Sequence, residues 1–161
     1  MPTSNVNNIV KGVVNGMGFS QHDSVPCNNA TFPIAEGDLV YWDSSAHLVK
    51  KLDTDAHAAT LLGVALKPSA VSSTIDSSSE PDVSVGYGCI ASFFTTAGET
   101  YNHGDLVYIG ADAQTILNTT GPNVNPVGCI QLKSGQAAVT GAAGVKIQVR
   151  VYSRAFVKSA N

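Results

Sequence analysis

The sequence predicts an all-β protein: a small β-barrel or β-tulip-like body built from two related units, with an extended N-terminal arm and at most short helices. Three observations lead to this fold class. No stretch of the 161 residues keeps a helical spacing of apolar side chains. The phrase GDLVY occurs at residues 37–41 and again at residues 104–108. Residues 145–152 alternate apolar and polar side chains, the period-two pattern of a half-buried antiparallel strand.

The N-terminal segment is rich in Asn, Gly and Ser and has little to form a core. Gly12, Gly16 and Gly18 would interrupt a helix. We therefore expect an extended arm or a weak edge strand over residues 1–30, followed by one β domain over residues 31–161. The few apolar side chains of the arm need something to pack against, and they are Val6, Ile9, Val10, Val13 and Val14.

The first pseudo-repeat covers about residues 32–95 and opens with a predicted hairpin. Residues 36–43 (EGDLVYWD) predict a turn followed by a strand rich in aromatic and β-branched side chains. Residues 47–53 (HLVKKLD) predict a second strand, with the turn residues Ser44 and Ser45 between the two.

A short helix and a buried strand are expected next. Thr54 or Asp55 is placed to cap a single helical turn that Gly63 ends. The carboxylates of Asp53 and Asp55 would then lie at a helix start, where exposed backbone amides favour negative charge. Residues 61–66 (LLGVAL) predict a short buried strand.

The first pseudo-repeat ends with a loop and a long strand. Residues 67–82 form a polar stretch with Pro near both ends, which predicts an insertion loop. Residues 83–94 predict one long β segment, in which Gly86 and Gly88 indicate a bulge or a bend.

The same order of segments recurs in a second pseudo-repeat, over about residues 96–156. The separation of matched positions falls slowly along the chain, which indicates small loop deletions, because loops tolerate length changes better than strands. The matched pairs are Gly37 and Gly104, Gly63 and Gly128, and Val85 and Val149, which lie 67, 65 and 64 residues apart.

The repeated GDLVY phrase is interpreted as a structural unit rather than as a binding motif. A phosphate loop needs several spaced glycines and a following helix, whereas GDLVY has one glycine and leads into a strand. A calcium loop needs several carboxylates within about a dozen residues, and the acidic residues here are too sparse. Each glycine is instead expected to take a turn conformation that other residues resist.

The composition limits the possible partners. Charged residues make up 13% of the chain, and Ser, Thr and Asn together supply 39 residues, so hydroxyls and amides must cover much of the surface. The net charge of −3 argues against gripping nucleic-acid phosphates. The most apolar run, residues 61–66, is too short to cross a bilayer, and residues 1–12 lack the features of a secretory signal. We expect neither nucleic acid nor membrane as a partner.

Residues that could carry chemistry are scattered along the chain. The cysteines are odd in number and lack a CxxC pattern, so buried thiols are expected rather than disulfides or a zinc site. The histidines are scattered and are expected on the surface or in turns, and no GxSxG motif occurs. The sequence therefore predicts a protein that is not an enzyme, with no cofactor, no metal and no catalytic residue. The cysteines are Cys27, Cys89 and Cys129, and the histidines are His22, His47, His57 and His103.

Residues 32–156 resemble the small capsid decoration (cement) proteins of tailed bacteriophages, and the resemblance occurs twice, once in each pseudo-repeat. The resemblance depends on the order of GDLV, then LGVAL, then an alternating strand. It implies a structural protein on the outer surface of the capsid, in a virion assembled in the host cytoplasm. It also implies that the protein clamps subunits of the major capsid protein, and that it does so as a homotrimer. The doubled unit and the loop at residues 67–82 depart from the shortest family members.

The resemblance also implies a role for the arm, which in this family often becomes ordered on the shell by adding a strand to a capsid element. By analogy, residues 1–20 would be that arm. The side chains expected to contact the capsid are Val6, Ile9, Val10, Val13 and Val14.

Two other readings remain open. One is a different virion component, such as a tail tube, a baseplate part or a head fibre. The other is a small β-barrel that binds a ligand or a glycan, which requires an exposed aromatic cluster. The two candidate pairs are Tyr41 with Trp42 and Tyr101 with Tyr108.

Overall fold

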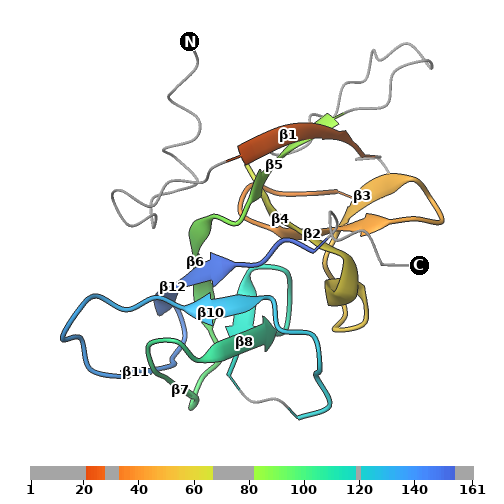
Figure 1. The fold of residues 1–161 in the computed structure, drawn as a ribbon. Coiled ribbons are helices and arrows are strands. Elements are labelled where there is room, and N and C mark those ends of the chain that lie inside the picture. The colour runs from red at the N-terminus through yellow and green to blue at the C-terminus, as the bar shows by residue number, and fades with distance from the viewer. Residues whose placement is uncertain (1–20, 28–32, 67–81, 119–120, 155–161) are drawn as a thin grey trace, which may run out of the picture.

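The computed structural model describes residues 21–27, 33–66, 82–118 and 121–154 (Figure 1). Within these residues the chain forms twelve strands and one 3-10 helix, so the predicted all-β fold class is confirmed. The elements of the first half are β1 (Gln21–Pro26), β2 (Leu39–Asp43), β3 (Leu48–Lys51), η1 (His57–Thr60), β4 (Leu61–Ala65) and β5 (Asp82–Tyr87). Those of the second half are β6 (Ile90–Thr95), β7 (Thr100–Tyr101), β8 (Leu106–Ile109), β9 (Thr115–Leu117), β10 (Gly128–Ile130), β11 (Val139–Thr140) and β12 (Lys146–Val151).

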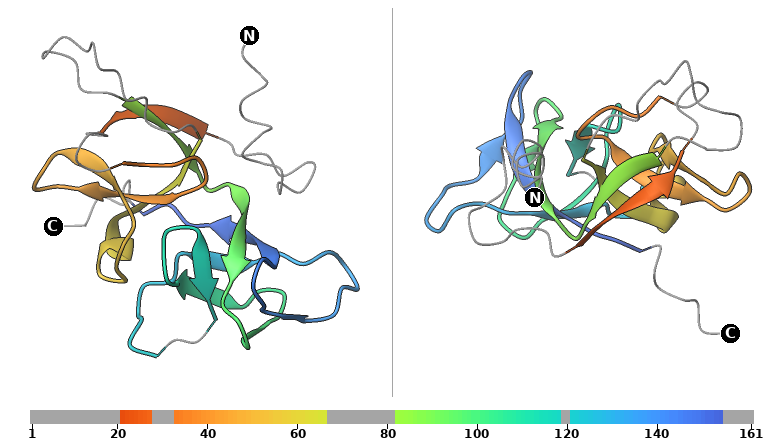
Figure 2. Two further views of the ribbon diagram at one scale, coloured as in Figure 1. Left: turned by 180° about the vertical axis from the view of Figure 1, so that it is seen from behind. Right: turned by 90° about the horizontal axis from the view of Figure 1, so that it is seen from above.

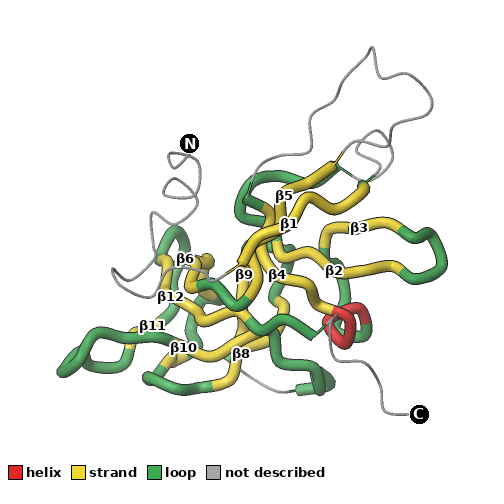
Figure 3. The backbone as a smooth tube through the Cα atoms, turned by 45° about the horizontal axis from the view of Figure 1, so that its top comes forward, coloured by secondary structure: helices red, strands yellow, loops and turns green. Residues whose placement is uncertain are grey.

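The strands form two main sheets. The first has five strands in the order β1-β5-β4-β2-β3, and the second is a closed barrel in the order β10-β12-β6-β9-β8. Figure 2 shows the first sheet curving as a half-barrel next to the closed barrel. Two short strands, β11 and β7, make a separate antiparallel pair. Figure 3 shows η1 as the one helical turn of the described chain. No helix in this part of the chain has the length and apolar character needed to cross a membrane.

The two sheets repeat one design. If β1, β5, β4, β2 and β3 are matched to β6, β12, β10, β8 and β9, the order of neighbours is the same in both. The registers agree as well, since Val40 pairs with Gly63 in the first sheet and Val107 pairs with Gly128 in the second. The body is therefore built from two related units, as the repeated phrase predicts.

The contact that closes each unit is also repeated. In the second unit β6 and β9 run parallel, with Thr95 opposite Ile116. In the first unit an isolated parallel bridge joins Cys27 to Val49, the matched positions. The half-barrel of the first unit therefore has the design of the closed barrel, but a single described bridge takes the place of the pairing between β6 and β9.

The strand pairing places the unit boundaries differently from the sequence pattern. Residues 83–94, expected to be one long segment, form most of two strands that are separated at Gly88, where φ is +57°. β6 pairs with β12 and β9 and so belongs to the second unit, although residues 90–95 were assigned to the first pseudo-repeat. β1, which lies within the expected arm, pairs with β5 and is the matching strand of the first unit. The structural units therefore span residues 21–87 and 90–151.

The expected insertion at residues 67–82 has a counterpart in the second unit. The stretch between β10 and β12 occupies the same place in the topology as the stretch between β4 and β5. The matched residues are 65 apart before it, at Gly63 and Gly128, and 64 apart after it, at Val85 and Val149. The two connections thus differ by one residue in length. Residues 67–81 themselves lie outside the described ranges.

Most local predictions for the strands are confirmed. β2 and β3 form an antiparallel hairpin, every residue of β4 is buried, and β12 alternates between buried and partly exposed side chains. The helical turn ends at Thr60, and Gly63 lies inside β4 rather than after a helix. Gly63 sits there because a side chain would strike the carbonyl oxygen of Gly86 on the neighbouring strand.

Two apolar clusters fill the molecule. The smaller cluster is the interior of the first unit and contains Val40, Val49, Leu62, Val83 and Val85. The larger cluster fills the barrel but also takes in side chains of β2, η1 and β4. It therefore joins the two units into one core, and the first unit contributes Leu39, Tyr41, Leu52, Ala58, Leu61 and Val64 to it.

Candidate functional site

The two GDLVY turns have the same hydrogen bonds. In the first, the Asp38 amide donates to the carbonyl of Ala35, and the Asp38 carboxylate accepts from the amide of Ala35 at 2.8 Å. The Gly37 amide donates to the carbonyl of Ala65, and the Ala65 amide donates back to the carbonyl of Asp38, both at 2.9 Å. Gly37 has φ of +90°, which a type II turn requires at its third residue.

The second copy reproduces each of these bonds. The Asp105 amide and carboxylate bond to Asn102, and the Asp105 carbonyl and Gly104 amide bond to Ile130. Gly104 has φ of +86°. The Gly and Asp groups of both copies are thus used within the turn and in joining it to the neighbouring strand. The structural interpretation of GDLVY is therefore confirmed.

The first turn also fastens the first unit to the second. Asp38 is 4% exposed, and its second carboxylate oxygen accepts a hydrogen bond from Gln114 Nε2 at 2.9 Å. Beside it, the Leu39 amide donates to the carbonyl of Ala113 at 2.9 Å. A buried carboxylate without partners would be costly, so these contacts hold the turn in place.

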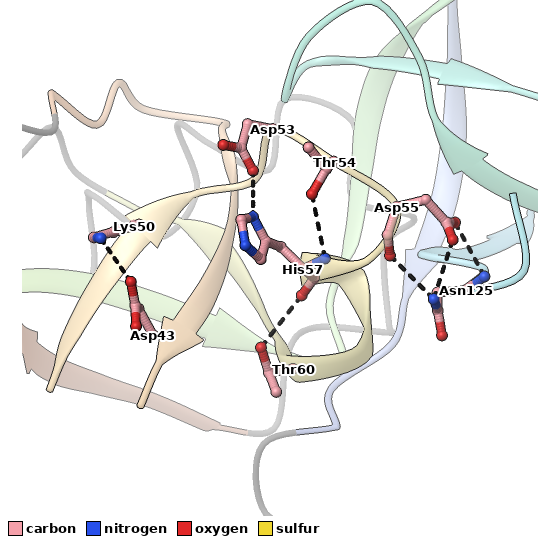
Figure 4. Close-up of polar contacts among 8 residues, drawn as sticks. All are labelled: Asp43, Lys50, Asp53, Thr54, Asp55, His57, Thr60 and Asn125. Atoms are coloured by element: carbon pink, nitrogen blue, oxygen red, sulfur yellow. Dashed lines mark hydrogen bonds and ion pairs between the residues drawn. The ribbon is translucent and has the colours of Figure 1, made fainter. Parts of the chain in front are cut away.

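Asp55 makes the second polar connection between the units (Figure 4). Its carboxylate accepts from the backbone amides of Val124 and Asn125, each at 3.0 Å. The Asn125 side chain donates to the Asp55 carboxylate and carbonyl, each at 3.1 Å. The expected capping role of Asp55 is thus wrong. The backbone amide of His57 instead donates to Thr54 Oγ1 at 3.4 Å.

The C-terminal end of the described chain adds a third connection. The Arg154 amide donates to the carbonyl of Leu61 at 2.8 Å, and its guanidinium donates to the carbonyl of Pro126 at 2.8 Å. Arg154 therefore bridges β4 of the first unit and the loop before β10 of the second. No sequence signal identified these connections, because their partners are far apart along the chain.

A group of charged side chains covers the outer face of the β2–β3 hairpin (Figure 4). Lys50 and Asp43 form an ion pair with 2.6 Å between Nζ and Oδ2, and each side chain is 19% exposed. Asp53 contacts His57 Nδ1 at 2.5 Å. This contact explains Asp53 better than the expected capping of a helix start.

The His57 ring lies flat against a buried tyrosine. The rings of His57 and Tyr41 are stacked, with centroids 4.3 Å apart and planes 7° apart. Burial, followed by the negative charge of Asp53, raises the pKa of Tyr41, so its hydroxyl stays protonated at neutral pH. The Lys50 hydrogen bond lowers the pKa of Asp43, and the same bond raises the pKa of Lys50.

These side chains line a surface hollow of 380 Å³, which we call the hairpin hollow. Its lining includes Tyr41, Asp43, Lys50, Lys51, Asp53 and His57. A histidine oriented by a carboxylate is a general base only if a reacting group lies within hydrogen-bond reach. No Ser, Thr or Cys of the described chain contacts the ring nitrogens of His57. The arrangement can hold a polar molecule through its charged and hydrogen-bonding side chains.

A second hollow, of 740 Å³, lies where the loop after β10 meets the second GDLVY turn. Its lining includes His103, Leu132 and Lys133. The Leu132 amide donates to His103 Nδ1 at 3.0 Å, which fixes the ring. Among the described residues that line this hollow there is no carboxylate.

The remaining residues singled out in the sequence fall into two groups. The arm residues expected to contact a capsid lie outside the described ranges, and they are Val6, Ile9, Val10, Val13 and Val14. The aromatic pairs that a glycan-binding module requires are not exposed clusters. Tyr41, Tyr101 and Tyr108 are buried, and Trp42 is half-buried against the interior of the first unit.

The three thiols differ in burial. Cys27 and Cys89 are buried, and Cys129 is half-buried. Burial raises the pKa of Cys89 to about 12, so its thiolate is scarce at neutral pH. In the part of the chain that the structure describes, no group of three or more His, Cys, Asp or Glu could hold a metal ion.

No protein-family model and no curated protein matches this sequence.

Proposed function

We propose that this protein is a structural component of a bacteriophage virion that binds the outer surface of the capsid and clamps neighbouring subunits of the major capsid protein. One observation carries the proposal: two barrels of the same design share an apolar core and are fastened by Asp38, Asp55 and Arg154. A body of this kind resists deformation and needs no reactive group. The resemblance of residues 32–156 to decoration proteins points to the same role.

The physics of such a clamp suits a chain of this composition. Adhesion to a shell depends on contact area, shape and the number of copies rather than on catalytic chemistry. Many equivalent sites make modest affinity at each site sufficient. A surface of hydroxyls and amides forms hydrogen bonds without the desolvation cost of buried charges.

The N-terminal segment supplies the proposed grip on the shell. β1 pairs with β5 and is the first described strand, so residues 1–20 precede an edge of the first unit. Added strands bind by main-chain hydrogen bonds and by pockets for alternate side chains. The side chains proposed to contact the capsid are Val6, Ile9, Val10, Val13 and Val14.

Deletion of residues 1–20 tests this role, because it removes the arm and keeps β1 intact. We expect the truncated protein to fold with unchanged circular dichroism, and to lose at least about tenfold in affinity for expanded capsids, since the strand contacts are absent. Binding is measured by co-sedimentation with purified shells, and occupancy by electron microscopy.

Two full-length variants accompany the deletion: one removes the apolar arm side chains, and the other is the control. Changing the five apolar arm residues to Ser should reproduce the deletion, whereas changing Asn5, Asn7 and Asn8 to Ala should leave binding unchanged. Undiminished binding by the truncated protein would remove the arm from the mechanism. Failure of the full-length protein to bind any expanded shell would refute the proposed function.

The proposed trimer is tested separately by light scattering on the purified protein and by the symmetry of its density on the shell. We expect three copies around each three-fold or quasi-three-fold position. A protein that is monomeric both in solution and on the shell contradicts this assembly.

A further inference from the structure

The hairpin hollow is a feature of the first unit alone. The matched positions of the second unit carry Tyr108, Gly110, Leu117 and Asn118 in place of Tyr41, Asp43, Lys50 and Lys51. β8 and β9 therefore form the same ladder without any of these charges. The fold does not require the charged lining, so the lining calls for another explanation.

Several polar groups of the hollow have no partner in the described chain. Lys50 and Asp43 bond to each other, but no hydrogen bond within the described residues reaches the Tyr41 hydroxyl, Lys51 Nζ or His57 Nε2. The same holds for the second carboxylate oxygen of Asp53. Donors and acceptors therefore meet in one hollow, as they do in binding sites for small polar molecules.

The charges of the lining cancel. Asp43 and Asp53 contribute two negative charges, and Lys50 and Lys51 contribute two positive charges. A site with no net charge gives a charged ligand no electrostatic advantage, and the ligand would still lose its hydration on entering. A neutral molecule with many hydroxyls fits better, because each hydroxyl both donates and accepts.

The His57 ring supplies a flat surface at the same place. One face of the ring lies against Tyr41, and the side chain is 45% exposed, which leaves the other face towards solvent. Sugars present a face of C–H groups that packs against flat rings. The adjacent Asp53 carboxylate can accept hydrogen bonds from two neighbouring hydroxyls, as carboxylates do with paired donors.

We propose that the hairpin hollow binds a neutral saccharide of one or two sugar units. The sugar ring packs on His57, its hydroxyls donate to Asp53, and Lys51 and the Tyr41 hydroxyl donate to its oxygens. The volume of 380 Å³ lies at the small end of the range of ligand sites, about 300–1,000 Å³, which limits the ligand to this size. This property is independent of the proposed grip on the capsid, whose contacts lie in the arm.

The test is a titration of the full-length protein with glucose, galactose, N-acetylglucosamine and their disaccharides, followed by two-dimensional amide NMR. At least one sugar is expected to shift the signals of His57, Lys50 and Lys51 saturably, with no shift at Asn118, the matched position of the second unit. Glucosamine and galacturonic acid, which carry a charge, are expected to bind at least about tenfold more weakly than their neutral parents.

Two conservative variants identify the site. Asp53→Asn is expected to weaken binding about tenfold because it removes the charge from the hydrogen-bonded carboxylate. Lys51→Asn, which installs the residue found at the matched position, is expected to weaken it less. Asn118→Ala is the control and should bind as the parent does. Thermal unfolding of each variant verifies that the fold is retained.

The inference is overturned if none of these sugars shifts the hollow, or if Asp53→Asn and Asn118→Ala bind sugar equally. It is also overturned if sugars have no effect and Asp53→Asn lowers occupancy on shells, since the hollow would then be a capsid contact. Shell binding that persists in Asp53→Asn while sugar binding is lost supports the inference. Loss of shell binding in the arm deletion bears on the proposed function alone.

Discussion

The glycines that the two units share serve two physical purposes. Gly37 and Gly104 have positive φ, and a Cβ atom on either would meet nothing within 4 Å. Gly63 and Gly128 do not have a positive φ, but a Cβ on either would overlap a backbone carbonyl of the adjacent strand. The turn glycines are needed for backbone conformation, and the strand glycines for close packing.

This difference predicts that substitutions at the two kinds of glycine lower the free energy of unfolding by different amounts. Gly37→Ala or Gly104→Ala should lower the free energy of unfolding by about 1–2 kcal/mol, the cost of a left-handed conformation for an L-residue. Gly63→Ala or Gly128→Ala should lower it by more than about 3 kcal/mol, because neighbouring strands must separate. Urea denaturation of the four variants measures both. Equal losses at the two kinds of site contradict this assignment.

Titration of the Cys89 thiol should make the free energy of unfolding depend on pH in the alkaline range. Burial raises its pKa from 9.0 to about 12, so between these values the unfolded chain loses the proton and the folded chain keeps it. The unfolded state then binds fewer protons, and the free energy of unfolding falls as pH rises from about 9 to 12. Tyr41 and Tyr101, whose pKa values burial also raises, act in the same direction.

Urea denaturation at a series of pH values measures this slope, and Cys89→Ala is the matched variant. The variant should be less stable at neutral pH but lose less stability between pH 9 and 12, since one titrating group is gone. Parallel curves for the parent and the variant would show that Cys89 does not titrate in this range.

Contacts at the residue scale could be anticipated from the sequence only where they are local. Asp53 and His57 are four residues apart, a spacing that brings side chains together on a helical turn. Asp55 and Asn125 are 70 residues apart, and Asp38 and Gln114 are 76 apart. No local pattern reveals such pairs, because the tertiary fold alone brings them together.

At the scale of elements, strands were predictable and their partners were not. The alternation in β12 and the apolar run in β4 result from which face is buried, and that is encoded locally. The break at Gly88 was mistaken for a bend within one strand, because a glycine can mark either a bulge within a strand or the passage of the chain from one sheet to the next. β6 could be assigned to the second unit only through its pairing with β12.

The loop that contains Asn125 depends on its connection to η1. Asp55→Ala should lower the free energy of unfolding by about 1–2 kcal/mol, because the amides of Val124 and Asn125 lose a charged acceptor and must turn to water. Asp53→Ala, two residues away, should cost less than about 0.5 kcal/mol, since its partner His57 is on the surface. Urea denaturation of both variants measures the difference. Equal losses in the two variants would mean that the hydrogen bonds of Asp55 to the second unit do not contribute to the free energy of unfolding.

At the scale of the whole molecule, the repeat was visible in the sequence and the joint between its copies was not. Spacings of 67, 65 and 64 residues between matched positions survive because strands and turn glycines constrain length. The joint is formed by the outer face of the first unit, where Leu39, Leu61 and Val64 enter the core of the barrel. Apolar residues on both faces of β2 and β4 are the pattern that such burial leaves in the sequence.

The shared core determines how the molecule should unfold. Because the larger cluster contains side chains of both units, opening the first unit exposes apolar surface of the second, and the two should unfold in one cooperative step. The single tryptophan, Trp42, lies in the first unit and reports on it by fluorescence. Circular dichroism reports on the strands of both units. We therefore expect the two urea transitions to coincide.

Leu39→Ala sharpens this test, because Leu39 belongs to the first unit and is fully buried in the shared cluster. The substitution should lower the midpoint of both transitions together, with a loss of about 2–5 kcal/mol. Val83→Ala, in the interior of the first unit alone, is the matched variant and should also shift both if the units are coupled. A fluorescence transition that moves without the circular dichroism transition would mean two independent barrels. Such a body would bend between its halves under load, which would argue against the proposed clamp.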